Sequence, residues 1–151
     1  MPIKSFRGLI ADGAIDTINL HTNNGSTGYR ITKFQLMPNR PSKVRSEHVV
    51  KIFKIPQPDP AVTPTSATVD FTDNTLLAAG IITNQTDAND AYSSEIIFDQ
   101  EIFNQDIFIT SFDDTGNESV NYYIELEQVK LGLDENTVAT LKDIRNIKSN
   151  E

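Results

Sequence analysis

The sequence contains no cysteine and no tryptophan, and only two of its 151 residues are histidine. Without cysteine, the chain cannot form disulfides, thiolate nucleophiles or cysteine-ligated zinc sites. No apolar run approaches the roughly 20 residues that cross a bilayer, and the first residues lack the apolar stretch of a secretory signal. We therefore expect no membrane partner and a protein that is made and used without export.

Basic residues are also missing from a long part of the chain. Residues 1–54 hold nine Lys or Arg and three Asp or Glu, whereas residues 55–129 hold fourteen Asp or Glu and no Lys or Arg. The net charge of -8 argues against nucleic acid as the main partner, because phosphate binding needs a positive surface. The charge segregation has two interpretations. Either strands of the two sections interleave and mix the charges, or the molecule has one basic and one acidic surface suited to contacts between copies.

Period-two alternation of apolar and polar residues predicts an all-β protein. We expect strands at residues 15–22, 29–38, 47–55, 68–73 and 121–131, and two more within 95–112 that separate near Asn104. Residues 74–83 fit a strand or a helical turn. Four prolines between Pro56 and Pro64 predict an extended surface loop. The pattern indicates a single domain over residues 1–151, an antiparallel β-sandwich of the jelly-roll kind.

Two of the expected strands have distinct faces. In the last one, Tyr122, Ile124 and Leu126 share the apolar face, and Tyr123, Glu125 and Glu127 share the other. In residues 29–38, strict alternation places Arg30, Thr32, Phe34 and Leu36 on one face, so that both faces carry apolar groups.

The C-terminal residues 134–151 fit either a short helix or an extended arm. Asp134 is a candidate N-cap, and Val138, Leu141 and Ile144 recur at helical spacing. The run from Thr137 to Leu141 is equally typical of a strand.

The loop "DDTGNES" joins the last two expected strands and offers calcium candidates. Asp113, Asp114, Asn117 and Glu118 supply the oxygen ligands that calcium prefers, but the spacing of a calcium-binding EF-hand loop is absent. The simpler interpretation is a hairpin turn with Gly116 in the left-handed conformation. We predict the turn, with no metal and no cofactor.

Catalytic motifs find little support in this sequence. A histidine general base would have to be His21 or His48, and neither stands in a recognisable constellation. The glycine-containing loop at residues 23–28 lacks the lysine and following helix of a phosphate-binding loop. We therefore predict that the protein is not an enzyme. A carbohydrate- or host-surface-binding module, associated with a tail or fibre, is the alternative, with Tyr123 as the tyrosine best placed to point outward.

Four stretches carry a resemblance to a known family. The segments "FRGLIADGAIDTINLHTNNGSTGYRITKF", "NQDIFIT", "NYYIELEQ" and "ENTVATLKDIRN" resemble small virion structural proteins of marine tailed phages. This resemblance implies a capsid decoration or cement protein, or another head or tail component, in a virion assembled in the host cytoplasm. It also implies copies of the chain and the major capsid protein as partners.

The residues expected at the interface of such a homo-oligomer follow from the charge pattern and the chain ends. The basic set is Arg30, Lys33, Arg40, Lys43, Arg45, Lys51 and Lys54. The acidic set comes from Asp99, Glu101, Asp106, Asp113, Asp114, Glu125 and Glu127. Tyr123, on the last strand, is expected at the same interface. Val138, Leu141 and Ile144 are expected to be buried against their own subunit or against a neighbouring copy. The terminal arms, residues 1–7 and 136–151, are expected to bind neighbouring copies.

Overall fold

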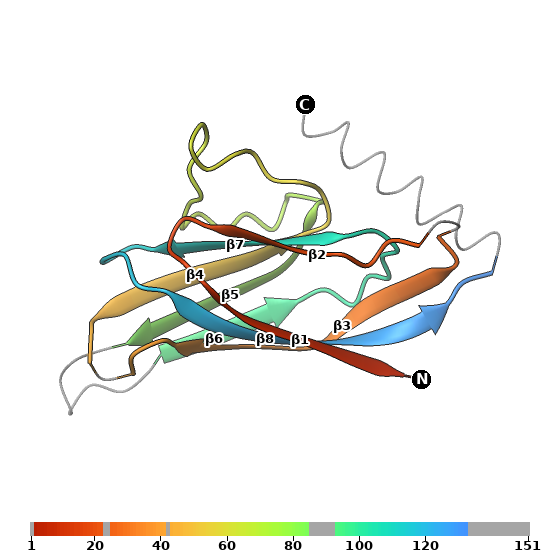
Figure 1. Ribbon diagram of the computed structural model, residues 1–151, viewed down its shortest axis with the longest axis horizontal. Coiled ribbons are helices and arrows are strands. Elements are labelled where there is room, and N and C mark those ends of the chain that lie inside the picture. The colour runs from red at the N-terminus through yellow and green to blue at the C-terminus, as the bar shows by residue number, and fades with distance from the viewer. Residues whose placement is uncertain (1, 23–24, 42, 85–92, 133–151) are drawn as a thin grey trace.

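The computed structural model describes residues 2–22, 25–41, 43–84 and 93–132, which form two facing antiparallel β-sheets (Figure 1). The strands are β1 (Ile3–Ile10), β2 (Ile15–Ile18), β3 (Thr27–Pro38), β4 (Ser46–Phe53), β5 (Leu76–Asn84), β6 (Ser93–Phe98), β7 (Ile107–Asp113) and β8 (Val120–Lys130). One sheet has the order β1-β8-β3 and the other has the order β2-β7-β4-β5-β6. The prediction of an all-β antiparallel sandwich is confirmed.

The strand pairing follows the scheme of a rolled-up hairpin. β1 pairs with β8, β2 with β7 and β4 with β5, so early strands pair with late strands in reverse order. β3 and β6 lie close together across the two sheets. This is the jelly-roll arrangement, with β6 attached to the edge of the five-stranded sheet. The basic section of the chain therefore lies beside the acidic section, and the interleaving interpretation of the charge pattern is confirmed.

The connection between β7 and β8 is not the hairpin that the sequence suggested. β7 pairs with β2 and β4, whereas β8 pairs with β1 and β3, so residues 114–119 cross from one sheet to the other. Among the described glycines, Gly13 and Gly25 have positive φ angles and Gly116 does not. The expectation of a left-handed Gly116 is therefore wrong, because a crossing connection does not need the tight turn of a hairpin.

A β-bulge in β3 overturns the strict alternation expected there. The register with β8 shifts between Ile31 and Lys33, so Arg30 lies opposite Glu127 and Lys33 opposite Glu125. The extra residue is Thr32, whose hydroxyl donates to the Glu125 carbonyl at 3.2 Å. The bulge keeps Tyr29, Ile31 and Phe34 in the core on both of its sides, although their spacing in sequence changes. Sequence alternation contains no signal for the position of a bulge.

The structure also decides three other expectations about secondary structure. The expected strand at residues 68–73 is wrong, because the side chains of Asp70 and Asp73 accept backbone bonds from Thr72 and Thr75 and fold this part into turns. Residues 74–83 belong mainly to β5. The expectation of an N-terminal arm is also wrong, because residues 3–10 form β1 and pair along β8. The C-terminal residues 134–151 lie outside the described residues.

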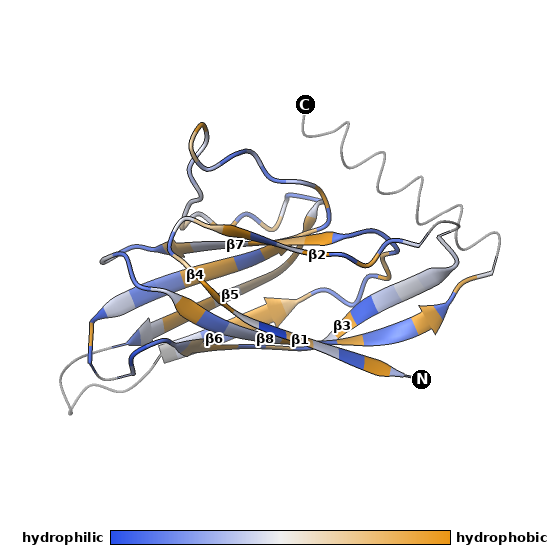
Figure 2. Ribbon diagram, in the orientation of Figure 1, coloured by the Kyte–Doolittle hydropathy of each residue, from blue (hydrophilic) through white to orange (hydrophobic). Residues whose placement is uncertain are grey.

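The core lies between the sheets, and alternating apolar residues along each strand supply it (Figure 2). The largest fully buried side chains include Phe103, Ile10, Ile31, Ile52, Leu77, Ile107, Ile109, Ile124 and Leu126. The Tyr122 hydroxyl crosses the sandwich and donates to Asp16 of β2 at 3.0 Å. Burial, together with the charge of Asp16, raises the pKa of Tyr122.

The proline-rich segment between β4 and β5 is a loop, as predicted, and it covers the outer side of the five-stranded sheet (Figure 1). The Thr65 hydroxyl donates to the Ser111 carbonyl of β7 at 2.7 Å. Lys51 of β4 donates from Nζ to the Thr68 carbonyl, also at 2.7 Å. Because of this cover, β4 is buried on both faces, including Val49 and Lys51 on its outer face.

Candidate functional site

Three charged residues from the expected interface are buried inside the subunit. Lys51 and Lys54 are 7% and 3% exposed, and Asp113 is 3% exposed. Lys54 Nζ forms a salt bridge of 2.7 Å with Glu101. Burial lowers the pKa of Lys51, against a smaller raising effect of Asp73. The expectation that these side chains face a partner is wrong for this fold, because each is buried and makes its contacts within the subunit. The loop between β4 and β5 supplies those of Lys51, and Glu101 pairs with Lys54.

Asp113 organises the connection between β7 and β8. Its carboxylate accepts hydrogen bonds from the backbone N–H groups of Glu47 at 3.0 Å, Thr115 at 3.1 Å and Glu118 at 3.0 Å. Burial acts to raise the pKa of Asp113, but these donors and the nearby His48 lower it overall. Asp113 is therefore an anion held by the backbone of its own subunit.

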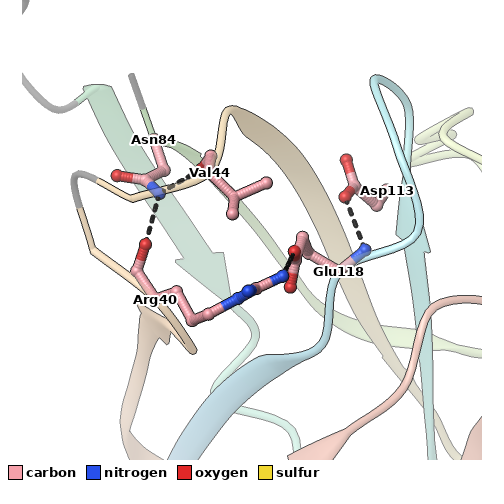
Figure 3. A network of polar contacts seen from close by, with 5 residues as sticks. All are labelled: Arg40, Val44, Asn84, Asp113 and Glu118. Atoms are coloured by element: carbon pink, nitrogen blue, oxygen red, sulfur yellow. Dashed lines mark hydrogen bonds and ion pairs between the residues drawn. The ribbon is translucent and has the colours of Figure 1, made fainter. Parts of the chain in front are cut away.

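Arg40 and Glu118 form an ion pair that joins the β3–β4 loop to the β7–β8 connection (Figure 3). Asn84, at the end of β5, donates from Nδ2 to the carbonyls of Arg40 at 3.0 Å and Val44 at 2.6 Å. Two of the calcium candidates, Asp113 and Glu118, are thus directed at partners of their own subunit. In the described part of the chain, no group of three or more acidic or histidine side chains is arranged so that it could hold a metal ion.

Asp106 also has a role within the subunit. Its Oδ1 accepts from the backbone N–H groups of Leu20 and His21, at 2.8 and 3.0 Å, and lies 2.7 Å from His21 Nδ1. Burial acts to raise the pKa of Asp106, but the bonds from His21 and Leu20 lower it overall. The remaining charged candidates in the loops, Lys43, Arg45 and Asp114, are exposed.

The outer face of the three-stranded sheet gathers five of the predicted interface residues. Tyr123, Glu125 and Glu127 lie on it along β8, as predicted, with Arg30 and Lys33 beside them on β3. The Tyr123 hydroxyl donates to Glu125 at 2.8 Å, and Arg30 pairs with Glu127 at 2.7 Å. The bond to Glu125 raises the pKa of Tyr123. Basic and acidic side chains expected to meet across copies therefore meet on one face of a single copy.

A depression of 760 Å³ lies at the end of this face where β3 runs into the β3–β4 loop. It is lined by residues 7–9 of β1, 35–37 of β3 and 121–123 of β8, and by Ser94 and Ile96 of β6. The lining thus includes the inward-facing Gly8, Leu36 and Tyr122 as well as the outward-facing Arg7, Leu9, Gln35, Met37, Asn121 and Tyr123. We call it the outer-face depression. Leu9 and Met37 flank Asn121 in the register and are 52% and 62% exposed. The depression thus combines exposed apolar side chains with polar and basic ones.

His48 is a buried group without hydrogen-bond partners. It lies in β4 between Ile82 and Asp113 of the neighbouring strands and is 0% exposed. Neither ring nitrogen makes a hydrogen bond within the described residues. Burial lowers the pKa of His48, and the charges of Asp113, Asp12 and Glu118 offset part of this effect. The sequence analysis did not identify this histidine as internal.

The sequence analysis missed four residues that the structure singles out. Arg7, Leu9 and Met37 line the outer-face depression, and Phe71 is 63% exposed in the loop between β4 and β5. Met37 lies in the strand expected at residues 29–38, but its face could not be assigned without the bulge. Leu9 lies in β1, which was not among the expected strands. For Phe71 a signal was present, since "DFTD" places an aromatic residue among turn-forming aspartates.

The C-terminal candidates Val138, Leu141 and Ile144 lie outside the described residues, and their expected burial stays a prediction. Within the described ranges, the search for a helix long and apolar enough to cross a membrane found none. No protein-family model matches the chain, and comparisons with curated proteins and with solved structures found no similar protein. The function is therefore inferred from the residues and their geometry.

Proposed function

We propose that the protein is a non-enzymatic structural component of a phage particle, in the role of a capsid decoration or cement protein on the head surface. The observation that carries this proposal is the pair of exposed apolar side chains, Leu9 and Met37, beside Arg7 and Tyr123 in the outer-face depression. Apolar and aromatic residues with a neighbouring arginine are typical of interface cores. The jelly-roll fold, which is common in viral capsid domains, and the resemblance of the sequence add support.

The mode of association follows from how the charges are used. Arg30, Arg40 and Lys54 are already paired inside the subunit, so complementary charged faces alone do not supply the affinity. Burying Leu9 and Met37 would contribute about 1 kcal/mol or more for each side chain. Exposed charges around these two side chains would orient the two partners as they approach, rather than add much binding energy. The partners are other copies of the chain and the major capsid protein, in a virion assembled in the host cytoplasm.

Particle composition tests this proposal directly. Quantitative mass spectrometry of purified particles of the phage that encodes the chain should find the protein at a fixed copy number relative to the major capsid protein. A copy number that matches a symmetry class of the head would be the expected result, because particle subunits occupy symmetric positions. Absence of the protein from purified particles that contain their other structural proteins would overturn the proposal.

A carbohydrate-binding module is the second candidate, and one observation favours it. Tyr123 lines the outer-face depression together with the amide side chains of Gln35 and Asn121. A tyrosine ring beside amide groups is suited to stack on a sugar and to bind its hydroxyls. Binding to a glycan array that Tyr123→Ala abolishes would support this candidate. Absence of binding by a folded, monodisperse sample would remove it.

A further inference from the structure

Phe71 is an aromatic side chain that the fold holds out in water. It is 63% exposed and lies between two successive turns. Asp70 Oδ1 accepts from the backbone N–H and the hydroxyl of Thr72, at 2.9 and 2.6 Å. Asp73 Oδ1 accepts from the same two groups of Thr75, at 2.9 and 2.6 Å. These bonds fix the backbone on both sides of Phe71, so its side chain is presented by a rigid segment.

A rigid, exposed aromatic residue is a candidate binding anchor. Aromatic side chains dominate the energy of protein interfaces, and an anchor that is already ordered loses little conformational entropy when it binds. Phe71 lines a second depression with Asp73, Ile97 and Asp99, beside β6 of the five-stranded sheet. Ile97 belongs to β6, and the outer-face depression also reaches this strand through Ser94 and Ile96.

The outer-face depression has the lining that such an anchor requires. Leu9 and Met37 are exposed there, and Tyr123 offers an aromatic ring. Arg7 lines the same depression, and it belongs to none of the salt bridges within the described residues. The apolar side chains match Phe71, and the guanidinium of Arg7 matches the carboxylates of Asp70 and Asp73 that flank it.

Asp70 is suited to be the charged neighbour in this contact. Its side chain is exposed, and hydrogen bonds from Thr72 hold its pKa below the ordinary value. The carboxylate is therefore ionised at neutral pH, where Arg7 is always protonated.

We propose that Phe71 of one copy inserts into the outer-face depression of the next copy, with Asp70 and Asp73 facing Arg7. This contact rests on the proposed structural role and names the partner as a second copy of the chain. The contact is heterologous, because the anchor and the depression are formed by different residues, and repetition of it builds a ring or a filament.

Light scattering of matched variants tests the contact. The wild type should form an oligomer, and Phe71→Ser should reduce its mass to that of the 16.8 kDa monomer. Met37→Glu should do the same, because it places a carboxylate in the depression opposite Asp70 and Asp73. Val62→Ser is the control, because Val62 is an apolar residue of the same loop and is 80% exposed. This control should keep the mass of the wild type.

Mixing the two monomeric variants gives the sharpest result. The Phe71→Ser protein keeps its depression and the Met37→Glu protein keeps its anchor, so one contact between them remains possible. An equimolar mixture should therefore form a capped dimer of twice the 16.8 kDa monomer mass. Asp70→Asn keeps the acceptor for Thr72 but removes the charge, and it should weaken the oligomer several-fold and reduce its sensitivity to salt.

The outcomes separate this contact from the proposed function. A wild-type oligomer that is unchanged in Phe71→Ser, or a mixture that stays monomeric, overturns the contact. So does an oligomer that Val62→Ser dissociates equally well, since the effect would then be general to exposed apolar residues. A monomeric wild type also overturns the contact between copies, whereas the structural role depends only on the presence of the protein in particles.

Discussion

Replacing His48 with leucine should make the protein more stable at neutral pH and less sensitive to acid. The neutral imidazole is 0% exposed, and neither nitrogen has a hydrogen-bond partner within the described residues. A buried polar group without a partner costs about 1–3 kcal/mol, and leucine is a buried apolar residue of similar size. We expect the free energy of unfolding at pH 7.5 to rise by about 1–3 kcal/mol in His48→Leu.

The pH dependence has a definite sign. Burial lowers the pKa of His48 in the folded state below 6.5, the ordinary value that applies to the unfolded chain. Above pH 6.5, both states hold a neutral ring and His48 adds no slope. Below pH 6.5, the unfolded state binds a proton that the folded state does not, so stability falls as the pH falls until the folded pKa is reached. The slope has an upper limit of about 1.4 kcal/mol per pH unit.

Urea unfolding between pH 7.5 and pH 5.0 measures this slope. The carboxylates of Asp70, Asp106 and Asp113 have lowered pKa values, so their contribution to stability is lost only in more acidic solution. His21→Gln is the control, because it removes the other histidine of the chain, and it should keep the loss of stability due to His48. Equal slopes in the wild type and His48→Leu, or a leucine variant that is less stable at pH 7.5, would refute the reasoning.

Two further predictions concern internal packing and charge. Lys54→Met should destabilise the fold by about 3 kcal/mol or more, because it removes the buried cation that pairs with the carboxylate of Glu101. Arg30→Gln should cost only about 0.2–1 kcal/mol, because Arg30 and Glu127 are in contact with water. Urea unfolding of both variants at neutral pH checks this order, and equal costs would contradict it. Gly80→Ala should cost about 1 kcal/mol in the same assay, because the added methyl group would lie 2.9 Å from Leu36 Cδ1 and 3.2 Å from the buried ring of Phe34. A neutral result there would mean that the Leu36 side chain moves aside and the Phe34 ring adjusts.

The faces of β8 could be predicted because that strand is regular from end to end. Each inward residue from Tyr122 to Leu126 alternates with an outward one, and no bulge interrupts the strand. β3 also mixes apolar and charged residues, but Thr32 adds an extra position that reverses the faces after it. The preference for a bulge at this point is set by the pairing with β8, which is distant in sequence.

The burial of Lys51 and Lys54 could not be predicted, since it depends on a loop folding back over a sheet. A lysine on the outer face of a strand is normally exposed, and the sequence pattern of β4 fits that reading. The proline-rich segment supplies the carbonyl of Thr68 to Lys51, while Glu101 reaches Lys54 from beyond β6. Both contacts join residues from different elements, and local periodicity contains no information about such pairs.

The charge segregation of the sequence has a topological explanation that bears on partner choice. A rolled-up hairpin places early strands beside late ones, so a basic first section and an acidic later section bring opposite charges together within one subunit, as Arg30 with Glu127 and Lys54 with Glu101. Internal pairing of this kind stabilises the fold and leaves less charge for partners. Arg7 stays outside these pairs and lies beside exposed apolar side chains. The charges that remain after internal pairing, rather than the total charge, are therefore the ones available for contacts with a partner.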